Sequence, residues 1–144
     1  TVHRQGAYTV TEMGGNEKSD AGKTGIPDIV LAATGSEVNL ALQAAKTALT
    51  RLGKTGGRDL RIRVISILDR ELLRKQGNNL RRQLFPPESR VITVEAGSSV
   101  CWEGLASSPD DAFGIDRFGL SGNGDEVAEA LGFTEEKLVE LILS

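Results

Sequence analysis

Residues 28–52 read DIVLAATGSEVNLALQAAKTALTRL, and this stretch decides the fold. Its first seven residues form a near-continuous apolar run, which is typical of a strand buried on both faces. The residues after the run repeat their apolar side chains at steps of three and four, as one side of an amphipathic helix does. These side chains are Val38, Ala41, Leu42, Ala45, Ala48, Leu49 and Leu52. The pattern predicts a buried strand followed directly by a helix that Gly53 ends.

The alternation of strand and helix continues along the chain. Residues 62–68 and 90–95 predict two more buried strands, and the polar stretch between them predicts a helix from Asp69 towards Leu84 that Pro86 and Pro87 end. Residues 6–12 and 112–116 predict two shorter strands. Helices at 125–131 and 135–143, the second capped by Thr134, are expected to close the chain. The fold class is therefore α/β, with a mostly parallel sheet of about five strands and helices on both faces.

Composition and charge exclude several classes of protein. The 144 residues suit one domain, no apolar run is long enough to cross a bilayer, and no secretory signal opens the chain, so we expect no membrane partner. Cys101 is the only cysteine, which excludes a disulfide framework and favours a reducing compartment such as the cytoplasm. Residues 51–90 carry eleven basic and four acidic side chains (+7), and residues 91–144 carry two and eleven (−9).

The basic stretch does not indicate a nucleic-acid-binding protein. Phe85 is its only aromatic residue, so bases would find almost nothing to stack on. We interpret the charges as solvated helix faces, because charge runs usually cover exposed surface. As an alternative, the opposite charges of neighbouring segments could meet within the fold or across a subunit contact.

The turn between the first buried strand and its helix is the main candidate site. Thr34 and Glu37 fit a capping box, in which the threonine hydroxyl accepts from a helix amide and the carboxylate reaches back to the cap amide. The same turn is a candidate anion site formed by Thr34, Gly35, Ser36 and Glu37, because a helix N-terminus carries free N–H groups and a positive dipole end. We favour the capped junction, since Glu37 already brings a negative charge and no Lys or Arg lies within the turn.

Two glycine-rich motifs resemble phosphate loops only in part. AGKTG (21–25) has Glu17 where a Walker A motif needs glycine, and it precedes a buried strand instead of following one. GLSGNGDEV (119–127) has Val127 where a third glycine belongs. We interpret the first as a loop and the second as the cap of the next helix.

Groups for acid–base or metal chemistry are scarce. His3 is the only histidine, and Cys101 has no spaced Cys or His to share a metal with, so neither is predicted to be catalytic or a metal ligand. The neighbours Asp110 and Asp111 are expected to lie in a solvated loop. Glu95 is the carboxylate with most functional interest, because the carboxyl ends of parallel strands line the crevice where α/β sheets bind ligands.

The order of motifs resembles the carboxy-terminal domain of transketolases over residues 6–143. The motifs are GAY (6–8), PDIVLAATGSEVNLALQAA (27–45), IRVISIL (62–68), RKQ (74–76), LFP (84–86), VITVEAG (91–97), Trp102, GIDRFGLSG (114–122) and LGFT (131–134). The resemblance implies a domain at 6–144 preceded by the end of a linker at 1–5. It also implies one antiparallel strand in the sheet. We expect the first strand in this role, because a loop and not a helix joins it to the next strand.

The resemblance implies a division of labour in a full-length enzyme. Such an enzyme uses thiamine diphosphate and Mg²⁺ to move two-carbon ketol units between sugar phosphates, and its other domains and a second subunit of a homodimer supply the cofactor and substrate sites. This chain would itself bind no cofactor or metal, perform no catalysis, and have a structural, dimer-forming and regulatory role. The alternatives are an anion- or nucleotide-binding regulatory module, or the equivalent domain of a 2-oxoacid dehydrogenase β subunit or of deoxyxylulose-phosphate synthase.

Overall fold

The computed structural model describes residues 5–15, 25–57, 59–96, 104–114 and 134–144. Its sheet contains five strands in the order β1-β3-β2-β4-β5. The strands are β1 (Ala7–Gly14), β2 (Ile29–Thr34), β3 (Arg61–Ile67), β4 (Arg90–Glu95) and β5 (Ala112–Gly114). β1 runs antiparallel to β3, whereas the other neighbouring pairs are parallel. The predicted sheet, with its antiparallel first strand at an edge, is confirmed.

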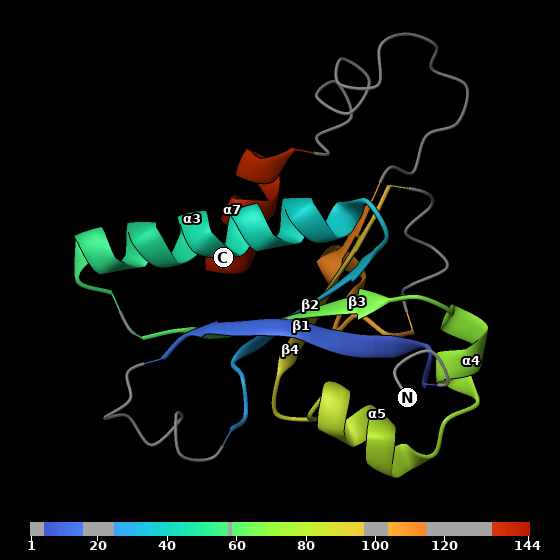
Figure 1. Ribbon diagram of the computed structural model, residues 1–144. Helices are drawn as coiled ribbons and strands as arrows, with labels where there is room; N and C mark the ends of the chain where they lie inside the picture. Colours follow the sequence, from blue (N-terminus) through green and yellow to red (C-terminus); the bar gives the residue numbers. More distant parts are fainter. Residues whose placement is uncertain (1–4, 16–24, 58, 97–103, 115–133) are drawn as a thin grey trace, which may run out of the picture.

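Helices cover both faces of this sheet (Figure 1). α3 (Glu37–Thr55) and α7 (Glu135–Leu143) lie on one face, and α4 (Arg70–Arg74) and α5 (Asn78–Leu84) lie on the other. Because successive strand side chains point to opposite faces, each central strand feeds two cores. Leu31 of β2 belongs to the core under α3, and Val30 belongs to the core over α5. The three-layer α/β architecture is therefore confirmed.

The helix boundaries differ from the predicted ones in two places. α3 continues past Gly53 and ends at Gly56, which takes the left-handed conformation (φ 68°) and donates its N–H to the carbonyl of Leu52. The single helix expected after Asp69 is two short helices, because the chain leaves the helical conformation at Gly77 (ψ 163°) before α5 starts. The apolar stripe of α3 is confirmed and also includes Ala44, which is fully buried. None of the described helices is long and apolar enough to cross a membrane.

Many of the basic side chains from 51–90 are engaged within the fold and do not form free helix faces. Arg51 of α3 holds Glu136 of α7 with two hydrogen bonds of 2.9 and 2.6 Å, and Arg90 of β4 holds Asp111 at 2.7 Å. Both pairs join the basic middle of the chain to its acidic end. The alternative that opposite charges meet within the fold is thus confirmed for these pairs. The interpretation as a solvated helix face is wrong for Arg90, which lies in a strand, but it holds for Arg51, which remains exposed on α3.

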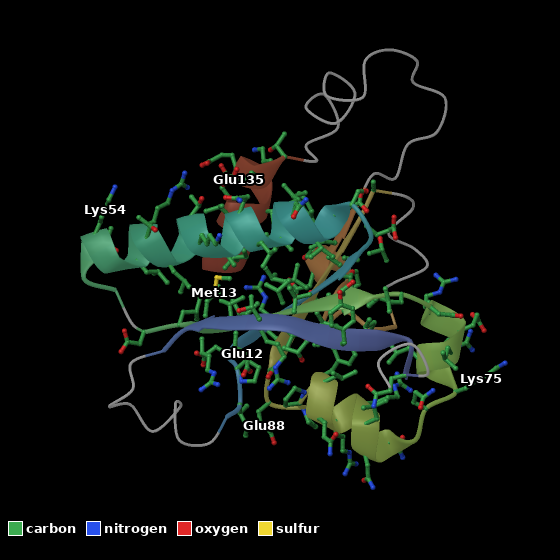
Figure 2. The ribbon with its side chains drawn as sticks, in the orientation of Figure 1. Glu12, Met13, Lys54, Lys75, Glu88 and Glu135 are labelled. Atoms are coloured by element: carbon green, nitrogen blue, oxygen red, sulfur yellow. The ribbon has the colours of Figure 1, made fainter. Side chains whose placement is uncertain are left out.

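Arg63 joins three separate parts of the chain to the sheet. Its guanidinium donates to the Glu12 carboxylate (2.8 Å) and to the carbonyl oxygens of Gln83 (2.6 Å), Leu84 (3.1 Å) and Gly25 (3.2 Å). Figure 2 places Glu12 on the side of β1 that faces away from α3, whereas its neighbour Met13 packs against the α3 core. The guanidinium therefore ties the edge strand, the end of α5 and the chain before β2 to the sheet.

Glu12 gives the stability of the fold a measurable pH dependence. Partial burial would raise the pKa of this carboxyl, but hydrogen bonds and positive charge from Arg63 and Arg61 outweigh it, so the pKa is lowered. A lowered folded-state pKa adds stability above the unfolded-state pKa, and this stability is lost as the pH falls through the folded-state value. We expect the difference in unfolding free energy between the wild type and Glu12→Gln to be largest near neutral pH. It should shrink below a pH of about 4.3, the ordinary pKa of glutamate.

Urea unfolding of both proteins at several pH values between about 7 and about 3 measures this difference. Glu71→Gln is the matched control, because Glu71 is exposed and has a single pair with Arg74 at 3.3 Å. A difference between wild type and Glu12→Gln that stays constant across the whole pH range would contradict the prediction.

Candidate functional site

The carboxyl ends of β2 and β4 lie side by side and bring together two residues singled out from the sequence. Ala33 pairs with Val94 in the parallel ladder, so Thr34 and Glu95 follow as neighbours at the strand ends. The Thr34 hydroxyl donates a hydrogen bond of 2.5 Å to Oε2 of Glu95. The edge of the sheet where α/β proteins bind ligands is thus occupied here by a hydroxyl–carboxylate pair.

The predicted capping box is wrong. The residue before the first turn of α3 is Ser36, which has helical backbone angles and makes no side-chain cap. The Thr34 hydroxyl lies 3.4 Å from Oε2 of Glu37 and therefore faces a carboxylate instead of accepting from a helix amide. Ser36 donates to the other oxygen of Glu37 at 3.0 Å. The Thr34 hydroxyl does not cap the helix because it donates to the carboxylate of Glu95, which comes from a distant part of the chain.

This arrangement makes the turn acidic. The Thr34 hydroxyl lies between the carboxylates of Glu37 and Glu95, so two carboxylates meet at this turn. A bound anion would have to approach both negative charges, which opposes the favourable dipole of α3. The anion-binding prediction for Thr34, Gly35, Ser36 and Glu37 stays a prediction, and the geometry favours hydrogen-bond donors and cations at this turn over phosphate.

Removing the Thr34 hydroxyl tests the strength of this link. We expect Thr34→Val, which keeps the β-branched shape, to lower the free energy of unfolding by about 1.5 kcal/mol, because a hydrogen bond to a carboxylate is lost. Ser36→Ala removes the hydroxyl of an exposed residue that bonds the neighbouring Glu37 carboxylate, so its effect should stay within about 0.5 kcal/mol. Equal effects of the two substitutions in urea unfolding would rule out the importance of the Thr34–Glu95 bond.

The neighbouring aspartates Asp110 and Asp111 differ in their exposure to solvent. Asp110 is exposed, as expected of a solvated loop, but Asp111 is 5% exposed, so the solvated-loop expectation is wrong for it. Its carboxylate accepts from Nε and Nη2 of Arg90 at the end of the 3₁₀ helix Pro109–Asp111. Burial of this charge is tolerated because the guanidinium pairs with it in a bidentate manner.

Other predictions concern residues that the structure does not describe. They are His3, the first four residues (21–24) of AGKTG, Cys101 and Trp102, and the helix and glycine motif within 119–131. Among the described residues, no three His, Cys, Asp or Glu side chains gather so as to hold a metal ion. These described residues do not fit an Mg²⁺ site.

Sequence reasoning missed a cavity on the opposite end of the sheet. Its volume is about 290 Å³, and it lies between α5, the turn before β4 and residues 104–107. Asn78, Arg81 and Arg82 line it from α5. The run of basic residues was visible in the sequence, but the loop at 104–107 that completes the cavity carries no motif.

Comparisons with known proteins identify the family. The family model described as the transketolase-like TK C-terminal domain matches residues 6–134. Over 143 residues the chain is 37% identical to the transketolase of Treponema pallidum, covering 99% of this chain and 18% of that protein. It is 39% identical over 114 residues to transketolase 1 of Saccharomyces cerevisiae, covering 79% of this chain and 15% of the yeast protein.

Solved structures agree with the sequence matches. Transketolase from Leishmania mexicana superimposes with a TM-score of 0.72 at 28% identity, over 97% of this chain and 18% of that one. Transketolase from Campylobacter jejuni superimposes with a TM-score of 0.70 at 31% identity, over 98% of this chain and 19% of that one. The chain thus spans about a fifth of the length of these relatives, and the matches do not favour a 2-oxoacid dehydrogenase or deoxyxylulose-phosphate synthase. The chain belongs to the family of transketolase-like C-terminal domains.

Proposed function

We propose that this chain acts as the carboxy-terminal domain of a transketolase and does not itself transfer ketol units. The observation that carries the proposal is the extent of the match: nearly the whole chain aligns, but with only 18% of the Treponema transketolase. The carboxyl edge of the sheet is compatible with a structural role, because the Thr34 hydroxyl links the turn before α3 to Glu95 at the end of β4.

The complete enzyme is proposed to use thiamine diphosphate and Mg²⁺, which supply the carbanion chemistry of ketol transfer between sugar phosphates. We place those groups on other domains, because the described residues of this chain do not fit a metal site. The enzyme would be cytoplasmic, residues 1–5 would be the end of the linker from the preceding domain, and residues 6–144 would be the domain itself.

An activity and binding assay tests the proposal. Thiamine diphosphate with Mg²⁺ is titrated onto the chain, and ketol transfer is then measured with a full-length transketolase as the positive control. We expect no turnover and no saturable binding by the chain. Turnover, or saturable binding in the micromolar range, would overturn the proposal.

A role in the dimer is part of the same proposal. A complete transketolase would be a homodimer to which this domain contributes contacts, and sedimentation equilibrium of the chain tests that contribution. Self-association that rises with concentration supports it, whereas a monomer at the highest attainable concentration counts against it.

A further inference from the structure

The cavity beside α5 has features of a ligand site that the proposed function does not use. It lies at the amino-terminal end of β4, whereas Thr34 and Glu95 lie at the carboxyl ends of their strands. Its volume of about 290 Å³ is just below the usual range for ligand pockets, about 300–1,000 Å³. The cavity therefore suits a small molecule.

Two arginines at the cavity have no partner among the described residues. Arg51, Arg61, Arg63, Arg74 and Arg90 each bind a carboxylate. The guanidinium groups of the exposed Arg81 and Arg82, by contrast, make no ion pair or side-chain hydrogen bond within the described part of the chain. Both line the cavity together with the amide of Asn78.

The surroundings of these arginines add positive charge. Residues 70–84 carry five basic side chains and one acidic one, a local charge of 5 − 1 = +4. Lys75, which follows α4, projects outward on the same side of the molecule as α5 (Figure 2). Such a field attracts anions towards the cavity.

The rest of the cavity combines apolar side chains with Ser89 and Ser107, and its wall is held in place. Phe85 and Leu105 are half-buried and pack against the core on this side of the sheet, and Pro86 beside them is buried. The loop is fixed to β4 by two hydrogen bonds, since the Ser107 N–H donates to the Val91 carbonyl (3.0 Å) and the Ser107 hydroxyl accepts from the Val91 N–H (2.7 Å). The wall is thus formed before any ligand arrives.

We propose that this cavity binds a small phosphate monoester. Arg81, Arg82 and Asn78 hold the phosphate, because guanidinium groups match its oxygens in charge and in geometry. The organic part lies against Phe85 and Leu105, where it loses contact with water. A phosphate monoester fits better than a purely apolar ligand, which would gain nothing from the two guanidinium groups.

Titrations of the 144-residue chain with phenyl phosphate and with inorganic phosphate, followed by backbone amide chemical shifts, test the proposal. We expect saturable shifts at 78–89 and 104–107 for both probes. Phenyl phosphate should bind about fivefold more tightly, because its ring buries apolar surface. The double variant Arg81→Gln/Arg82→Gln should bind about tenfold more weakly, since the charge-assisted hydrogen bonds are lost.

Two single variants test the arginines and the apolar wall of the cavity separately. Arg74→Gln removes an equally basic side chain that is 70% exposed and already paired with Glu71, so it should weaken binding much less than the double variant does. Leu105→Ala should remove the advantage of phenyl phosphate and leave the affinity for inorganic phosphate unchanged. If a variant does not fold, its amide spectrum loses its dispersion. The residues whose amide shifts change in the wild type then show whether phosphate binds in this cavity.

Three results would overturn the proposal. They are equal binding by the wild type and the double arginine variant, shifts confined to residues 34–38, and saturation by a glutamate-rich peptide when neither phosphate binds. The last result would identify a docking site for an acidic protein segment instead. None of these measurements uses ketol transfer, so the cavity and the proposed function can fail independently.

Discussion

Replacing Arg63 with methionine is expected to lower the free energy of unfolding by about 3 kcal/mol. The Arg63 side chain is 11% exposed, so its partners depend on it for much of their hydrogen bonding. Without the guanidinium, the carbonyls of Gln83, Leu84 and Gly25 lose a donor, and the Glu12 carboxylate keeps its pair with Arg61 at 3.1 Å. Methionine keeps an apolar stem that reaches about as far as Nε, so the loss reports mainly on the guanidinium and not on packing of the stem.

Two further variants make this prediction specific. Arg63→Lys keeps the positive charge but lacks the planar fork, so it should recover about half of the loss. Arg74→Met removes an exposed arginine with one contact, and its effect should stay within about 0.5 kcal/mol. Urea unfolding at neutral pH measures the free energy of unfolding of the wild type and of these three variants. A loss below about 1 kcal/mol for Arg63→Met would show that water replaces the missing donors.

The strands were the part of the fold most readable from the sequence. Ile29–Thr34 and Arg90–Glu95 are short apolar runs between turn signals, and burial on both faces leaves few other ways to place them. The helix ends were less readable, because several glycines compete as stop signals. Gly53 and Gly56 both follow the apolar stripe, and the choice depends on which carbonyl of α3 each amide can reach.

Long-range pairing explains what the sequence could not predict. Thr34 had a local partner in Glu37, but the parallel ladder brings Glu95 closer, and that contact spans 61 residues. Arg63 looked like part of a basic surface, yet a residue 51 positions earlier binds it. Local patterns predict caps and helix faces, whereas these contacts depend on strand order, which only the folded sheet sets.

Replacing Leu31 with alanine is expected to have an effect of similar size through packing alone. Leu31 is fully buried in β2, which lies in the middle of the sheet between β3 and β4. Its side chain belongs to the core beneath α3. Deleting three of its carbons removes buried apolar surface and leaves a cavity. The sheet and helix cannot close this cavity fully, so we expect a loss of about 3 kcal/mol.

Leu68→Ala is the matched control, because it makes the same chemical change one residue beyond the end of β3. Leu68 is 50% exposed, so the substitution should cost less than about 1 kcal/mol. Chemical denaturation gives the m-value of both variants. An m-value equal to that of the wild type shows that the substitution changed the stability and not the denatured state. If Leu31→Ala and Leu68→Ala lowered the free energy of unfolding equally, the core beneath α3 would be loosely packed. The three-layer arrangement would then not depend on the buried face of β2.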